Sequence, residues 1–168
     1  MPPIITFIGW HNCGKTTLAT QVVRHLKERG YSVAVIKSTK ETGLLTDQNE
    51  TDTKRYRQAG ADAVALAAPD QIVLTLPNQE KELLALVDRF CTDSDIVIGE
   101  GFKTAQHVEK IEVCRGSGKL LRDQVVGVVA VAADRKISGG HHFWLSESKK
   151  IADFIENRLL KRTQKPES

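Results

Sequence analysis

The residues with the clearest chemical role form one segment near the start of the chain. Residues 9–16, GWHNCGKT, match the pattern G-x-x-x-x-G-K-[ST] of a phosphate-binding loop. Glycines let such a backbone curl so that successive N–H groups face phosphate oxygens, and the helix that follows adds the partial positive charge of its N-terminus. Lys15 is then placed to reach the β- and γ-phosphates, and Thr16 to offer its hydroxyl to Mg²⁺. The pattern predicts a nucleotide site, and a plain strand-to-helix turn is the alternative without function.

A nucleoside triphosphate also needs acidic ligands for its metal ion, and two residues are candidates. Glu100 directly follows the apolar run at 96–99, and metal-binding acids occur at the ends of such strands. Asp52 begins a predicted helix, so a helix N-cap explains it as well as a metal or water-binding role does. We predict Thr16, Glu100 and Asp52 as metal ligands, and Lys15, Asp52 and Glu100 as the groups that act on the phosphates.

Two further candidate contacts each follow a predicted strand. Lys37 belongs to the same sheet edge as the phosphate-binding loop, where ligands gather. Asp134 is a candidate reader of a guanine base, with a helix or turn cap as the alternative, and the Asn-Lys-x-Asp guanine signature is absent. Cys13 is interpreted as a small filler rather than a nucleophile, because no histidine is placed to activate it. The predicted nucleotide contacts are Gly9, Asn12, Cys13, Gly14, Lys15, Thr16, Thr17, Lys37 and Asp134.

The elements that position these residues alternate between strands and helices. Strands are predicted at 4–8, 32–36, 95–99, 110–114, 125–132 and 142–145, and helices at 16–29, 52–59, 79–90 and 146–162, the last capped by Ser146. Two runs at 63–68 and 71–76 favour an antiparallel hairpin, and 37–51 is predicted as a polar loop. The fold class is α/β, a P-loop NTPase with a mostly parallel twisted sheet and helices on both faces. We predict one nucleotide-binding domain over 1–163 and a short flexible tail at 164–168.

Composition excludes several classes of protein. The 168 residues carry 24 Lys and Arg against 21 Asp and Glu, and a net charge of +3 is too small to indicate a nucleic-acid-binding face. No stretch approaches the 18 apolar residues of a membrane span. The three cysteines form no C-x-x-C pair, so neither a disulfide framework nor a zinc site is indicated, and a reducing cytoplasm is expected. The adjacent His141 and His142 of a predicted strand point to opposite faces and make a poor metal chelate.

Several segments together resemble one family, the MobB proteins, which are molybdopterin-guanine dinucleotide biosynthesis adapter proteins. The phosphate-binding loop is common to many families, whereas the order and spacing of Glu-Gly-Phe-Lys at 100–103 and Lys-Ile at 110–111 are more specific. The other matching segments are 7–10, 14–18, 36–37, 52–53, 59–61 and 128–134. The resemblance implies GTP binding with at most weak hydrolysis, a homodimer, and assistance to a molybdopterin guanylyltransferase or a molybdoenzyme maturation partner.

The chain departs from the family pattern in one region. Members commonly carry a histidine-rich run after the second-strand lysine and a Gly-Lys before the Asp-Ser/Thr pair, where this chain has Ser-Thr-Lys at 38–40 and Glu-Thr at 50–51.

Two alternative functions stay open. A small-molecule kinase would use Arg115, Lys119 and Arg122 as a closing lid. A metal-delivery GTPase would carry a Cys-x-x-Cys or a histidine-rich tail, and the chain has neither.

Overall fold

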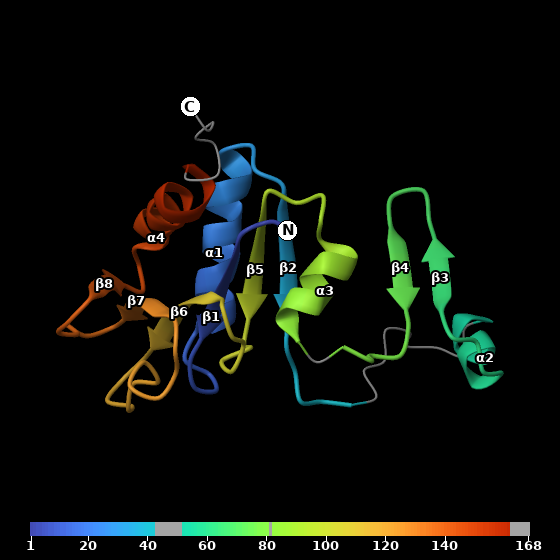
Figure 1. The fold of residues 1–168 in the computed structure, drawn as a ribbon, viewed down its shortest axis with the longest axis horizontal. Helices are drawn as coiled ribbons and strands as arrows, with labels where there is room; N and C mark the ends of the chain where they lie inside the picture. Colours follow the sequence, from blue (N-terminus) through green and yellow to red (C-terminus); the bar gives the residue numbers. More distant parts are fainter. Residues whose placement is uncertain (43–51, 81, 162–168) are drawn as a thin grey trace. The chain divides into compact units, whose positions relative to one another are not determined.

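The computed structural model describes residues 1–42, 52–80 and 82–161 (Figure 1). The chain gathers into two compact units, one of Met1–Thr39 with Glu82–Ser168 and one of Lys40–Lys81, and each is described by itself. The single domain expected over 1–163 stays a prediction, and the tail expected at 164–168 lies outside the described residues.

A six-stranded sheet forms the centre of the first unit. Its strands are β1 (Ile4–Ile8), β2 (Val33–Lys37), β5 (Ile96–Glu100), β6 (Glu109–Cys114), β7 (Val128–Ala133) and β8 (His141–Trp144). They lie in the order β2-β5-β1-β6-β7-β8, and every neighbouring pair is parallel. All six strands therefore end at one edge of the sheet, where ligands of parallel α/β folds bind. The predicted α/β fold class is confirmed.

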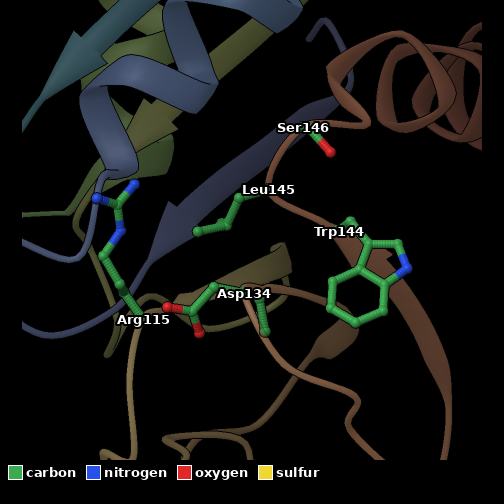
Figure 2. Close-up of a pocket in the computed structure, with 6 residues that line it drawn as sticks. Arg115, Asp134, Trp144, Leu145 and Ser146 are labelled. Carbon is green, nitrogen blue, oxygen red and sulfur yellow. The ribbon is translucent and has the colours of Figure 1, made fainter.

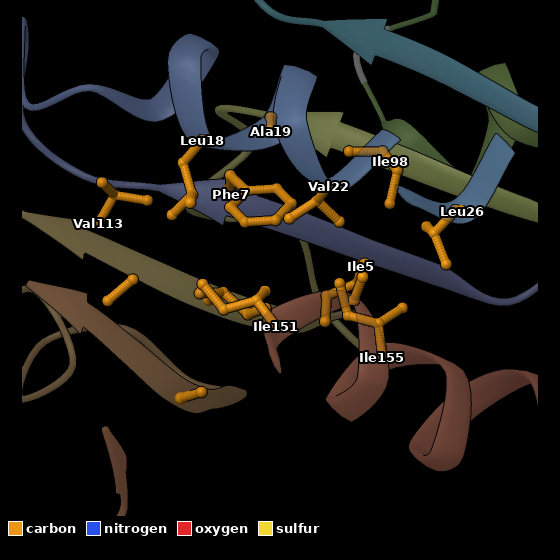
Figure 3. Close-up of a cluster of buried hydrophobic side chains, with 14 of the residues drawn as sticks. Ile5, Phe7, Leu18, Ala19, Val22, Leu26, Ile98, Val113, Ile151 and Ile155 are labelled. Carbon is orange, nitrogen blue, oxygen red and sulfur yellow. The ribbon is translucent and has the colours of Figure 1, made fainter. Parts of the chain in front are cut away.

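Helices cover the two faces of this sheet. On one face, α1 (Lys15–Glu28) packs against α4 (Ser148–Ile155). Figure 3 shows Phe7 of the sheet beneath the apolar stripe of α1, whose residues Leu18, Val22 and Leu26 recur every four positions and are all buried. On the other face, α3 (Leu83–Phe90) buries Leu83 and contributes to a second core cluster with β5.

The second unit holds a helix and a hairpin. Helix α2 (Asp52–Gln58) buries none of its residues. Strands β3 (Val64–Ala67) and β4 (Ile72–Thr75) pair antiparallel, which confirms the predicted hairpin. The Ala68 N–H donates to the Gln71 carbonyl at 2.8 Å and closes the turn. The loop predicted at 37–51 is irregular over 38–42, and its remainder lies outside the described residues.

Three predicted boundaries are wrong by more than one residue. Strand β7 begins at Val128 because Gly127 takes a left-handed conformation with φ +86°. Helix α3 begins at Leu83 rather than at residue 79. The last helix begins at Ser148 with Glu147 as its N-cap, so Ser146 does not cap it, and its final turns form the π-helix η1 (Glu156–Leu160). No helix within the described ranges is long and apolar enough to cross a membrane.

Candidate nucleotide site

The loop between β1 and α1 has the curled backbone that its sequence pattern predicts. Asn12 and Gly14 take left-handed conformations with φ +57° and +94°. At Gly9 a Cβ atom would lie 2.3 Å from the Val113 carbonyl oxygen and 2.6 Å from Cys13 Sγ, so only glycine fits there. The Cys13 side chain is itself buried in the core beneath the loop. A backbone that turns in this way gathers its N–H groups into a concave anion site.

The start of α1 adds further donors to this site. Gly14 is the N-cap, and no side chain caps the helix. The first bond within the helix is donated by the Leu18 N–H to the Gly14 carbonyl at 3.0 Å. The N–H groups of Lys15, Thr16 and Thr17 therefore have no partner within the helix. Such a helix start is a binding site for phosphate.

Lys15 is held inside the curl of the loop. Its Nζ donates to the Trp10 carbonyl at 2.7 Å and to the Gly9 carbonyl at 3.2 Å, and lies 3.7 Å from Cys13 Sγ. The ammonium group thus lies within the loop that leads into α1, where it adds a full positive charge to the partial charge of the helix start.

A polar cluster of three residues lies on one side of the loop. The Thr16 hydroxyl donates to Glu100 Oε1 at 2.7 Å, and Lys37 Nζ lies 3.3 Å from the same oxygen and 3.5 Å from Thr16 Oγ1. Lys37 and Glu100 are register partners at the ends of β2 and β5, so the sheet itself brings them together. Glu100 is only 7% exposed. A hydroxyl and a carboxylate are the hard oxygen ligands that Mg²⁺ prefers, so these residues fit the metal ion of a nucleotide.

A strained turn fixes Glu100 at this edge. Gly101 and Phe102 follow it with φ +92° and +52°, and the left-handed conformation of Phe102 is costly for a side chain of its size. The Gly101 N–H donates to the Phe7 carbonyl at 3.0 Å, and the Ser38 N–H donates to the Glu100 carbonyl at 2.9 Å. The Glu-Gly-Phe-Lys segment is thus a tight turn between β5 and its neighbours.

The other side of the loop faces residues 115–122, the basic segment that the kinase alternative would use as a closing lid. Both oxygens of Asp134 accept the Gly116 N–H, at 3.0 and 2.9 Å, so this side chain caps the first turn of the segment. The Trp10 indole donates to the Lys119 carbonyl at 2.8 Å, which ties the segment to the phosphate-binding loop. Asp134 therefore has the turn-capping role that was the alternative to base recognition.

The far end of the basic segment is anchored as well. Glu112, fully buried in β6, accepts the N–H groups of Leu121 and Arg122 at 2.5 and 2.9 Å. The Arg122 guanidinium donates to the carbonyls of Ser138 and Gly139 at 2.7 and 2.6 Å. The segment is thus held at both ends, and the Arg122 side chain is bound to another loop. This arrangement does not support the closing lid of the kinase alternative.

A cleft of about 420 Å³ opens at the ends of β6, β7 and β8 (Figure 2). Its lining residues are Arg115, Ala133, Asp134, Trp144, Leu145 and Ser146. Sequence reasoning placed only Asp134 here as a nucleotide contact. The sequence analysis did not single out Trp144, and it named Arg115 only for the lid of the kinase alternative. Each residue stands at the end of a predicted strand, which is the signal that could have placed them beside this cleft.

Asp52 belongs to the second unit, whereas the other predicted site residues belong to the first. It is the first residue of α2, is exposed, and pairs with Arg55 at 3.7 Å. Its role as a metal ligand or catalytic group stays a prediction. Within the described ranges no group of three or more His, Cys, Asp or Glu side chains forms a metal site of its own. That result is compatible with Mg²⁺, which commonly takes one or two protein ligands together with phosphates and water.

Comparisons with known proteins identify the family of the chain. The family model for molybdopterin guanine dinucleotide synthesis protein B matches residues 4–134. The molybdopterin-guanine dinucleotide biosynthesis adapter protein of Escherichia coli (strain K12) is 32% identical, over 96% of this chain and 96% of its own length. The probable adapter protein of Bacillus subtilis (strain 168) is 28% identical, over 94% and 93%.

Solved structures show the same architecture. A crystal structure of molybdopterin-guanine biosynthesis protein B superposes with a TM-score of 0.76 at 28% identity, covering 92% of this chain and 98% of that one. The crystal structure of Bacillus subtilis MobB gives a TM-score of 0.75 at 25% identity, covering 94% and 98%. The resemblance predicted from the sequence is confirmed: the chain belongs to the MobB family.

Proposed function

We propose that this chain binds GTP with Mg²⁺ and holds it as an adapter in the synthesis of molybdopterin-guanine dinucleotide. The observation that carries the proposal is the curled loop of residues 9–16 with the Thr16–Glu100 hydrogen bond beside it, in a chain of the MobB family. This arrangement offers donors for phosphate on one side and oxygen ligands for a cation on the other.

Each group has a distinct part in this proposal. Lys15 and the first N–H groups of α1 bind the β- and γ-phosphates. Thr16 and Glu100 hold Mg²⁺, with Asp52 as a further candidate, and the ion neutralises the charge of the triphosphate when it is bound. Lys37 adds positive charge at the phosphate end of the nucleotide, because its ammonium group lies 3.3 Å from Glu100 Oε1.

The guanine base is proposed to occupy the cleft at β7 and β8. Asp134 lines this cleft, and a carboxylate can accept from both the N1–H and the exocyclic amine of guanine. An ionised carboxylate has about four acceptor positions, so its bonds to the Gly116 N–H leave capacity for the base. The preference for GTP over ATP therefore depends on Asp134.

We propose that the second unit mediates a homodimer. Leu66, Ile72 and Leu74 of the hairpin are 51%, 73% and 50% exposed, although their side chains are large and apolar. A two-stranded sheet alone is marginally stable in water, so a second copy of the chain would cover this surface and stabilise the hairpin. Analytical ultracentrifugation should find a dimer that Ile72→Asp converts to monomer. A wild-type monomer would contradict the proposal.

Steady-state phosphate release tests whether GTP is held or consumed. P-loop proteins that lack a positioned catalytic arginine or glutamine hydrolyse GTP slowly, so release by the purified protein should stay far below about one turnover per second. Adding a molybdopterin guanylyltransferase with its pterin substrate should raise the formation of the guanine dinucleotide. Lys15→Ala, as the matched control, should remove this gain.

Two results would contradict the adapter role. One is rapid GTP hydrolysis without a partner. The other is efficient phosphate transfer to a small alcohol or nucleoside, which would favour the kinase alternative in spite of the anchored basic segment.

A further inference from the structure

Arg115 lies between the phosphate-binding loop and the cleft. No ion pair or hydrogen bond joins the Arg115 guanidinium to any other of the described residues, although Arg115 lines the cleft. Its Nη2 lies 3.5 Å from the position that a Cβ atom on Gly14 would take. Figure 2 shows the guanidinium beside the start of the N-terminal helix. We infer that Arg115 binds the α-phosphate of the nucleotide, an inference that rests on the proposed function.

The electrostatic surroundings of Arg115 point to an anionic ligand. The start of α1 carries a partial positive charge, and Lys15 adds a full positive charge to the same loop. A further cation is unfavourable at this end of a helix unless an anion lies between them. The guanidinium also has the planar, forked arrangement of donors that matches phosphate oxygens. A phosphate group is the anion that these three sources of positive charge would bind together.

The order of the strands identifies which phosphate this is. Arg115 follows β6, which pairs with β1 on one side and with β7 on the other. Neighbouring strands are about 4.8 Å apart, so Arg115 lies one strand from the phosphate-binding loop and one strand from Asp134. Glu100 and Lys37 lie beyond the loop in the opposite direction, at the ends of β5 and β2. If the base occupies the cleft and the Mg²⁺ lies at Glu100, the α-phosphate is therefore the phosphate group that lies beside Arg115.

The backbone around Arg115 is held in place for this role. Cys114, the residue before it, ends β6 and is buried. Gly116, the residue after it, donates its N–H to both oxygens of Asp134. The side chain is therefore presented from a fixed position, which reduces the entropy lost when it binds a phosphate.

Calorimetric titration of GDP and GTP into the wild-type chain and three variants tests the inference. Arg115→Ala should weaken both nucleotides about 10- to 100-fold, the range of a hydrogen bond between charged groups. Arg115→Lys should lie between this variant and the wild type, because it keeps the charge and loses the fork. Arg89→Ala removes an exposed arginine from α3 and should leave both affinities unchanged. Circular dichroism checks that each variant is folded.

Phosphorus NMR of bound GDP assigns the contact to one phosphate. In Arg115→Ala the α resonance should return toward its free position, and the β resonance should change less. Affinities equal to the wild type, or a change confined to the β resonance, would overturn the inference while leaving the proposed function intact. A wild-type chain that binds no guanine nucleotide would overturn both.

Discussion

Lys110 allows a sharp test of how the sheet edge is built. This lysine is 1% exposed, and its Nζ donates to the carbonyls of Ala105, Val108 and Val126 at 2.7, 2.9 and 2.9 Å. It therefore joins the segment that crosses from β5 to β6 with the segment that enters β7. We expect Lys110→Met, which keeps the apolar stem and removes all three donors, to destabilise the fold.

The size of this loss follows from the burial of the acceptors. The bonds to Ala105 and Val108 are fully buried, whereas the bond to Val126 is only partly so. Leaving two buried carbonyls unpaired costs about 1–3 kcal/mol each, and part of this is offset because a buried charge is removed. We expect a net loss of about 2–4 kcal/mol in the free energy of unfolding, or about 4–16 °C in melting temperature for a chain of this length.

The same substitution should have a defined pH dependence. Burial lowers the pKa of Lys110 below its ordinary value of 10.5. Between the lowered pKa and 10.5 the unfolded chain binds more protons at this lysine than the folded chain does. The free energy of unfolding of the wild type therefore increases as the pH rises through this range. The methionine variant has no such group. The difference in the free energy of unfolding between the wild type and Lys110→Met should therefore increase as the pH is raised through this range.

Urea denaturation of both proteins at neutral pH and near about pH 10 measures the difference directly. Lys27→Met, on the exposed face of α1, is the matched control and should change stability by less than about 0.5 kcal/mol. The reasoning would be refuted if Lys110→Met were as stable as this control. It would also be refuted if the difference in the free energy of unfolding between the wild type and Lys110→Met decreased with rising pH.

Three further outcomes are expected. Glu100→Gln should weaken GTP binding more in the presence of Mg²⁺ than in EDTA by calorimetry, and equal losses would show that the carboxylate is structural only. Asp134→Asn, which keeps an acceptor for the Gly116 N–H, should lower the ratio of GTP to ATP affinity, and an unchanged ratio would mean that another group reads the base. Glu112→Gln should cost about 1–3 kcal/mol in urea denaturation, because a neutral amide is a weaker partner for the two buried N–H groups. The amide group of glutamine has a single acceptor oxygen, so one of the two N–H groups of Leu121 and Arg122 loses its acceptor. No loss would mean that the basic segment is held by other contacts.

The features that the sequence predicted well have local causes. The apolar run at 4–8, the glycine pattern of the loop and the four-residue spacing of Leu18, Val22 and Leu26 lie within a few turns of chain, and the structure forms the strand, loop and helix that they predict. Glu100 is also predicted by a local pattern, because the apolar run at 96–99 places it at the end of a strand.

The features that were missed depend on pairing between distant segments. The sequence offered Arg115 only as part of a basic lid, and its position between the loop and the cleft arises because β6 lies between β1 and β7. Lys110 and Glu112 are charged residues of β6, and both are buried. Loop carbonyls accept from Lys110 and loop N–H groups donate to Glu112, and the sequence gives no sign of these contacts. Ser146 has the residue type of an N-cap, but Glu147 occupies that position.

Binding of GTP to wild-type protein and to Lys15→Ala is the most direct test of the account. Calorimetry at saturating Mg²⁺ should show saturable binding by the wild type and none by the variant, because Lys15 is the cation held within the curl of the loop. The two proteins should melt at similar temperatures, since the ammonium group contacts only atoms of the loop and its shortest hydrogen bond, to the Trp10 carbonyl, is exposed. Equal GTP affinity in a folded Lys15→Ala variant would contradict the assignment of residues 9–16 as the nucleotide site.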